Sequence, residues 1–134
     1  MENAVKSIKN DISTEEDIKL MVDSFYARVN ENPLLSDVFN GFAKVDWDSH
    51  LPRMYQFWEG LILGKQGFKG NPFAVHQPLP INKEHFEQWI GLFVENIDAL
   101  FEGEVTEQTK LRARSIAHIF ESKLSALSSM KNDI

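Results

Sequence analysis

The segment STEEDIKLMVDSFYARVNENP (residues 13–33) decides the fold class, because it carries every mark of an amphipathic helix. Ser13 or Thr14 is expected to cap its start, since an acidic residue follows three positions later. The Asn32-Pro33 pair ends it, because a residue before proline avoids the helical region of backbone space. Between these ends, apolar residues recur at helical spacing, at Ile18, Val22, Phe25 and Val29.

The rest of the chain shows the same periodicity and no convincing strand alternation. Pro52 is tolerated in a helix that begins at Asp48 or Ser49, because the first four N–H groups of a helix have no partner inside it. We therefore expect an all-α protein with one domain over residues 1–134, built from four substantial helices and two short pieces. The further segments expected to be helical are a short piece at 34–39 ended by Gly41, a helix ended by Gly64, a helix from Asn82 to Gly103, and a last helix at about 107–127.

The composition excludes several classes of function. A net charge of −6 with no cluster of Lys and Arg argues against a nucleic-acid partner. The absence of cysteine excludes disulfides, thiolate zinc sites, iron–sulfur clusters and cysteine-linked haem. The N-terminus lacks the apolar run of a signal peptide, and no stretch approaches the roughly 18 apolar residues of a membrane span. We therefore expect a cytoplasmic protein that binds neither nucleic acid nor membrane.

The known catalytic motifs are also missing. The sequence contains no nucleophile elbow, P-loop, zinc-protease motif or dinucleotide-binding glycine pattern. Asp46 and Asp48 are close enough to form a pair of carboxylates, but acidic residues are common where a helix starts. We interpret them as helix-start residues.

The stretch GNPFAVHQPLPI (residues 70–81) holds His76 among apolar residues and between prolines. A stiff backbone reduces the freedom that a metal ligand loses on binding, and apolar neighbours keep water from a metal. One histidine cannot complete a zinc site, which needs four ligands. It can supply one axial bond to a haem iron, because the porphyrin supplies four others. A purely structural histidine is the alternative at this position.

The remaining histidines are interpreted more conservatively. His50 shares a helix face with Met54 and is expected at the edge of a pocket. His85, in the first turn of its helix, and His118, in the middle of another, are expected at the surface.

The aromatic residues can fill a core or line a cavity. Phe86, Phe93 and Phe120 fall at helical spacing and are expected in the core. Tyr26 and Trp89 differ, because each carries a polar group that must find a partner when buried. Two such donors facing one cavity would suit a ligand that accepts hydrogen bonds, although local patterns alone do not bring them together.

Five blocks, in this order, resemble the third group of the truncated haemoglobins. The resemblance covers about residues 12–120, so the first and last dozen residues lie outside it. It implies a two-over-two helical sandwich, in which two helix pairs cross, holding haem b. The blocks that carry it are FYARV, NPLLSDVF, DWDSHLPRMYQFW, GNPFAVHQPLPI and HFEQWIGLFVENIDALFEGE.

The resemblance also implies roles for single residues. His76 matches the histidine that binds the iron on the proximal side, and His50 matches the distal histidine that controls ligand access. Tyr26 and Trp89 match a distal hydroxyl and a distal indole donor. The residues expected as walls of the haem pocket are Phe39, Met54 and Phe93.

The function that the resemblance implies is binding of O2, NO or CO at a five-coordinate iron, in a polar pocket that holds O2 tightly. An alternative is redox chemistry, either NO dioxygenation or peroxide reduction, with electrons from an external reductase. A haem-based sensor would require an output domain, and none is evident in the sequence. A haem-free helical binding module, in which the aromatic residues only fill a core, remains a further alternative.

Overall fold

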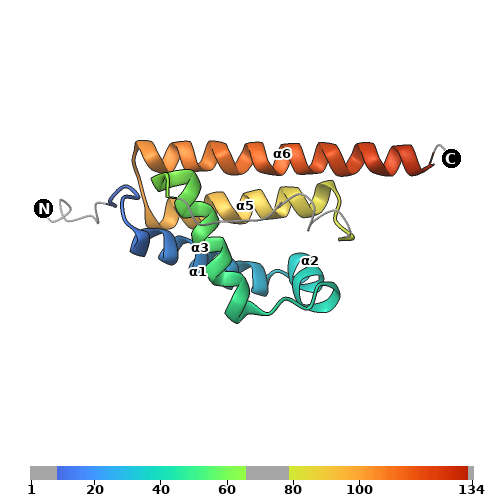
Figure 1. Ribbon diagram of the computed structural model, residues 1–134, viewed down its shortest axis with the longest axis horizontal. Coiled ribbons are helices and arrows are strands. Elements are labelled where there is room, and N and C mark those ends of the chain that lie inside the picture. The colour runs from blue at the N-terminus through green and yellow to red at the C-terminus, as the bar shows by residue number, and fades with distance from the viewer. Residues whose placement is uncertain (1–8, 66–78, 133–134) are drawn as a thin grey trace, which may run out of the picture.

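The structure, a computed structural model, describes residues 9–65 and 79–132, with side chains placed as far as residue 126. Within these ranges every regular element is a helix, which confirms the expected all-α class (Figure 1). None of these helices combines the length and hydropathy that crossing a membrane requires. The elements are α1 (Glu15–Glu31), α2 (Pro33–Ser36), the π-helix η2 (Asp37–Phe42), α3 (Trp47–Leu63), α5 (Lys83–Leu100) and α6 (Glu104–Asn132).

The four long helices form two crossed pairs. Helix α5 packs against α6 on one side and against α1 on the other, and α3 packs across α1 (Figure 1). The pair α1 and α3 therefore lies over the pair α5 and α6, which confirms the expected two-over-two sandwich. The short elements α2 and η2 follow α1 in the chain. Helix α2 contacts both α1 and α5, and η2 packs against α2.

The ends of α1 and α3 follow the sequence closely. The Thr14 hydroxyl accepts a hydrogen bond from the backbone N–H of Asp17 (3.1 Å). The Asp17 carboxylate accepts in return from the backbone N–H groups of Thr14 (3.1 Å) and Ser13 (2.9 Å), which completes a capping box. Gly64 ends α3 with φ of 72°, a left-handed conformation that glycine adopts without strain.

Two of the expected elements differ in the structure. The short helix does not end before Gly41 but continues through it as the π-helix η2, in which the N–H of Ala43 donates to the carbonyl of Val38, five residues back (2.8 Å). Helix α3 starts at Trp47, earlier than expected, because a carboxylate oxygen of Asp46 accepts from the backbone N–H of Asp48 (3.2 Å). Pro52 consequently lies beyond the first four positions of the helix.

The start of α6 depends on a residue far away in sequence. Asp11 accepts hydrogen bonds from the backbone N–H groups of Val105 (2.9 Å) and Thr106 (2.8 Å) and from the Thr106 hydroxyl (2.8 Å). Gly103 precedes this turn with φ of 147°, and a β-carbon there would collide with the Asp11 side chain. These contacts explain why α6 begins at Glu104, before the expected position at about 107.

Replacing Asp11 by alanine is expected to lower the free energy of unfolding by about 1–2 kcal/mol, the cost of losing a good helix cap. Burial alone would raise the pKa of Asp11, but the hydrogen bonds from Val105 and Thr106 outweigh it and lower that pKa. The stabilisation is therefore fully present above about pH 4, the usual pKa of an unfolded aspartate, and is lost progressively as the pH falls through the lowered pKa of the folded protein.

Urea denaturation of the wild type and Asp11→Ala at pH 7 and at about pH 3 measures this difference. Asp98→Ala is a suitable control, because Asp98 pairs with Lys110 at the surface, where such pairs contribute little. An Asp11→Ala loss no larger than that of Asp98→Ala, or a loss that does not shrink between pH 7 and about pH 3, would contradict the capping role.

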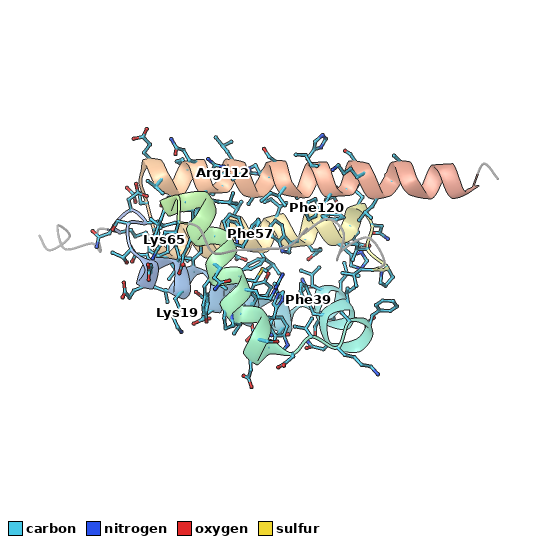
Figure 2. The ribbon with its side chains drawn as sticks, in the orientation of Figure 1. Lys19, Phe39, Phe57, Lys65, Arg112 and Phe120 are labelled. Atoms are coloured by element: carbon cyan, nitrogen blue, oxygen red, sulfur yellow. The ribbon has the colours of Figure 1, made fainter. Side chains whose placement is uncertain are left out.

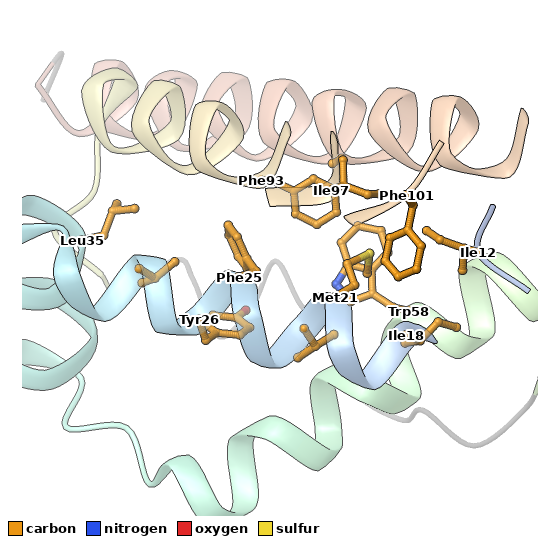
Figure 3. Close-up of a cluster of buried hydrophobic side chains, with 13 residues drawn as sticks. Ile12, Ile18, Met21, Phe25, Tyr26, Leu35, Trp58, Phe93, Ile97 and Phe101 are labelled. Carbon is orange, nitrogen blue, oxygen red and sulfur yellow. The ribbon is translucent and has the colours of Figure 1, made fainter. Parts of the chain in front are cut away.

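The core lies between the two helix pairs (Figure 3). The expected inward residues of α1 are all buried, and they pack with Trp58 from α3 and with Phe93 and Ile97 from α5. One polar residue joins this core: the amide of Asn96, 1% exposed, donates to the Met21 carbonyl (3.0 Å) and accepts from the Arg28 side chain (3.2 Å). These bonds tie α5 to α1 at a fixed register.

Candidate functional site

A cavity of about 540 Å³ opens beside the core, between α1, α3, α5 and α6. This volume falls within the range of about 300–1,000 Å³ that is typical of small-molecule sites. Its walls are mainly aromatic and aliphatic; Phe39, Phe57 and Phe120, labelled in Figure 2, come from η2, α3 and α6. The other described lining residues are Tyr26, Leu35, Val38, His50, Arg53, Met54, Trp58, Leu79, Ile81, His85, Phe86, Trp89, Ile116 and Ala117.

Tyr26 reaches the cavity from α1. Its side chain is 7% exposed, and among the described residues its hydroxyl makes no hydrogen bond. Burial raises the pKa of Tyr26, because the charged phenolate is poorly solvated inside the protein. The hydroxyl therefore stays protonated at neutral pH and presents an O–H donor to whatever occupies the cavity.

Trp89 enters the same cavity from α5. Its ring lies edge-on to Phe25 (5.5 Å between ring centroids) and stacks on Phe93 (5.6 Å). Phe25 also touches the Tyr26 ring edge-on (4.9 Å), so it joins the two polar aromatics. The structure thus brings together two residues that local sequence patterns could not place relative to each other.

His50 lies in the first turns of α3, where its backbone N–H donates to the Asp46 carbonyl (2.9 Å). Its ring packs against those of Tyr26 (5.4 Å) and Phe39 (6.2 Å), and its Nε2 atom is buried. Phe39 and Met54 also line the cavity. An imidazole, a phenol and an indole from three helices therefore meet around one volume.

Several residues lie elsewhere than expected. Phe93 is not among the described lining residues, although the resemblance implied that it would be; it is 1% exposed and stacks on Trp58 (5.1 Å), so it lies in the core, as its helical spacing had predicted. Phe86 and Phe120 line the cavity, so the expectation that they fill the core was wrong. Helical spacing shows that a residue faces inward, but does not distinguish a packed core from a cavity wall.

His85 is not a simple surface residue, in contrast to His118, which is exposed as expected. Its ring lines the cavity, and its Nδ1 accepts the backbone N–H of Asn82 (3.1 Å) in the capping box of α5. The sequence prediction missed this role because histidine is an unusual residue at that position of a capping box. His76 lies outside the described residues.

Arg53 also lines the cavity and follows His50 by three positions, so helix geometry places both on one face. That spacing was a usable signal in the sequence. Tyr55, two residues later, does not line the cavity; its hydroxyl donates to Asp23 on α1, and the Lys19 ammonium lies 5.3 Å from its ring centroid.

Residues 7–123 match the family of bacterial-like globins. The chain is 30% identical over 121 residues to the group 3 truncated hemoglobin ctb of Campylobacter jejuni, covering 87% of this chain and 95% of that protein. These figures agree with the resemblance noted from the quoted sequence blocks.

Solved structures give the same result. The fold is similar to the crystal structure of a group III truncated hemoglobin from Campylobacter jejuni, with a TM-score of 0.80 and 30% identity over 87% of this chain and 95% of that one. It is also similar to a truncated oxygen-avid haemoglobin from Bacillus subtilis, with a TM-score of 0.70 and 29% identity over 80% and 92% of the two chains.

Proposed function

The chain belongs to the bacterial-like globins, and from this premise we propose that it is a haem-b protein that binds O2 and other diatomic ligands and holds O2 tightly. The observation that carries the proposal is Tyr26, a residue 7% exposed whose hydroxyl makes no hydrogen bond among the described residues and which lines an aromatic cavity. Once a ligand fills the cavity and excludes water, such a donor is costly unless the ligand accepts its hydrogen bond.

The described residues fit a haem. The cavity of about 540 Å³ has broad aromatic and aliphatic walls, which suit a flat apolar macrocycle. Its polar side chains are few: Tyr26, His50 and Trp89 come from α1, α3 and α5, and Arg53 and His85 complete the set. Arg53, an exposed residue at the cavity, offers a cation for the carboxylates that a haem carries.

Each residue has a distinct part in this proposal. When bound, a haem supplies an iron atom that coordinates a diatomic ligand. His76 is proposed as the residue that would hold the iron, on the strength of the sequence resemblance. The Tyr26 O–H and the Trp89 Nε1–H donate hydrogen bonds to a polar ligand in the cavity, and the surrounding apolar walls exclude water. His50 controls ligand access from α3.

Redox chemistry is the second candidate function. A protein that holds O2 tightly releases it slowly and is a poor carrier, which favours NO dioxygenation or peroxide reduction with electrons from an external reductase. The position of His50 at the cavity supports this candidate, because peroxide chemistry needs a distal group that exchanges a proton and an imidazole can supply it. The oxygen-avid relative from Bacillus subtilis supports tight O2 binding. Mixing the ferrous O2-loaded protein with NO and an added reductant, and measuring nitrate, separates an enzyme from a carrier, because only an enzyme is returned to the ferrous state and forms more than one nitrate per chain.

A titration of the purified protein with haemin tests the haem site itself. A sharp Soret band that saturates at one haemin per chain is expected, whereas the spectrum of free haemin alone would contradict the proposal.

Two variants of helix α6, one that fills the cavity and one at the surface, make the test specific. Ala117 lines the cavity and Ala126 is exposed, so Ala117→Phe is expected to impair haemin binding while Ala126→Phe leaves it unchanged.

Replacing His50 by alanine is expected to accelerate ligand binding more than it alters the final bound state. If the inward position of His50 is favoured by about 1.4 kcal/mol, its removal speeds ligand access about tenfold. Flash photolysis of the CO complex measures the rebinding rate directly. An unchanged rate would count against control of access by His50.

A further inference from the structure

Trp47 lies behind the cavity wall, at the first position of α3. It is not among the described lining residues. Its ring stacks on Phe39 (5.6 Å) and packs edge-on against His50 (5.4 Å), with Tyr26 at 5.3 Å. Trp47 therefore touches the aromatic groups that line the distal side without being exposed to a ligand there.

The indole nitrogen of Trp47 is held by a residue of η2. Its Nε1–H donates to the side-chain oxygen of Asn40 (2.8 Å). The Asn40 amide donates in turn to Asn30 on α1 (2.8 Å) and to the Ser36 hydroxyl on α2 (3.1 Å). A single hydrogen-bonded chain thus joins the start of α3 to the end of α1 and to the two short helices.

We propose that the Trp47–Asn40 hydrogen bond is a latch that holds His50 inside the cavity and thereby sets the rate at which diatomic ligands reach it. The inference rests on the proposed function and adds a positioning residue to it. His50 is three residues after Trp47, on the same side of the first turns of α3, and the two rings are in contact. A displacement of the Trp47 ring therefore removes one wall of the site that holds His50.

The Trp47–Asn40 hydrogen bond joins the two ends of the segment between η2 and α3. The residues between Phe42 and Trp47 contain Lys44 with φ of 51°, a left-handed conformation that is uncommon outside glycine. Such a segment keeps its shape only where neighbouring contacts hold it. The Asn40–Trp47 hydrogen bond spans this segment, so its loss allows the first turn of α3 to move away from the cavity with His50 attached.

The test uses flash photolysis of the haem-loaded protein with CO. Trp47→Phe keeps an aromatic ring and removes the N–H. Asn40→Ala changes no ring and removes the acceptor, together with the bonds that its amide donates to Asn30 and Ser36. Each is expected to raise the CO association rate about 2- to 10-fold. Loss of one neutral hydrogen bond shifts the equilibrium between the inward and outward positions of His50 by about this factor. The double variant is expected to be less than additive and close to Asn40→Ala, because Asn40→Ala already removes the bond that Trp47→Phe breaks.

A His50→Ala background shows whether the latch acts through His50. In that background Asn40→Ala is expected to leave the CO association rate unchanged. A rise of the same size there would overturn the proposal, as would unchanged rates for both single variants in the presence of His50. Asp11→Ala serves as the control for general destabilisation, because Asp11 binds the start of α6 and not the cavity.

A measurement without haem separates failure of the latch from failure of the proposed function. If the wild type takes up no haemin, the proposed function fails. The position of His50 can then still be measured in the haem-free protein from its imidazole proton signals in the nuclear magnetic resonance spectrum. Ring currents from Tyr26, Phe39 and Trp47 are expected to shift these signals away from those of the exposed His118. Asn40→Ala is expected to move them back toward His118, and an unchanged spectrum would overturn the latch.

Discussion

Replacing His76 by alanine is expected to remove the sharp Soret band that haemin gives with the wild type. The resemblance implies that the His76 side chain binds the iron on the proximal side. Aromatic cavity walls cannot form such a bond. Loss of an outer partner of a metal ligand already costs about 10- to 100-fold in metal affinity, so loss of the ligand itself should cost more. An absorbance titration with haemin measures the change.

The control for this experiment is another histidine of the chain. His118 is exposed on α6, so His118→Ala is expected to leave the titration unchanged. Added imidazole is expected to restore part of the Soret band in His76→Ala, because the free base can take the place of the missing ring. A His76→Ala protein with the wild-type spectrum would assign the iron ligand to a different residue; His50 and His85, which both line the cavity, would then be tested in turn.

The helices that could be predicted from the sequence are those whose ends are fixed locally. Thr14 and Asp17 cap α1 from within three residues, and a glycine at position 64 ends α3 directly. The start of α6 could not be predicted this way. Its cap is Asp11, 94 and 95 residues before the two backbone N–H groups that it binds, and no local pattern reports such a contact.

The site was predictable only in part, for a physical reason. Apolar periodicity identifies the inward face of a helix but not what that face meets. Phe93 and Phe120 carry the same helical signal, yet Phe93 is in the core and Phe120 lines the cavity. The resemblance supplied Tyr26, His50 and Trp89 as a set, and the structure places all three around one cavity.

The contacts of Trp47 and His85 could be predicted neither from helical spacing nor from the family resemblance. Both act through contacts that depend on tertiary structure: the Trp47 indole donates to Asn40 (2.8 Å), and the His85 ring accepts from the backbone of Asn82 (3.1 Å) while facing the cavity. Spacing in the sequence records where a side chain points along a helix, not which hydrogen bond it makes there. His76 remains a prediction of the sequence resemblance, since it lies outside the described residues.

Replacing Tyr26 by phenylalanine is expected to accelerate O2 dissociation by about 10- to 100-fold. Hydrogen bonds to acceptors that carry partial charge contribute about 1.5–3 kcal/mol, and about 1.4 kcal/mol corresponds to a factor of ten. CO is a weaker acceptor, so its dissociation should change far less. Stopped-flow measurement of the O2 and CO dissociation rates in both proteins gives the comparison. If neither rate differs between the wild type and Tyr26→Phe, Tyr26 is not a donor.

Tyr55→Phe is the matched control for this change, because it removes the same hydroxyl from a tyrosine that donates to Asp23 and does not line the cavity. It is expected to leave both dissociation rates unchanged. The pH dependence provides an independent check on Tyr26. Burial raises its pKa, so the protonated donor persists above the pH of about 10 at which an exposed tyrosine ionises. O2 dissociation from the wild type should therefore stay slow up to about pH 10, and a rise toward the Tyr26→Phe rate near pH 8 would contradict a buried, protonated hydroxyl.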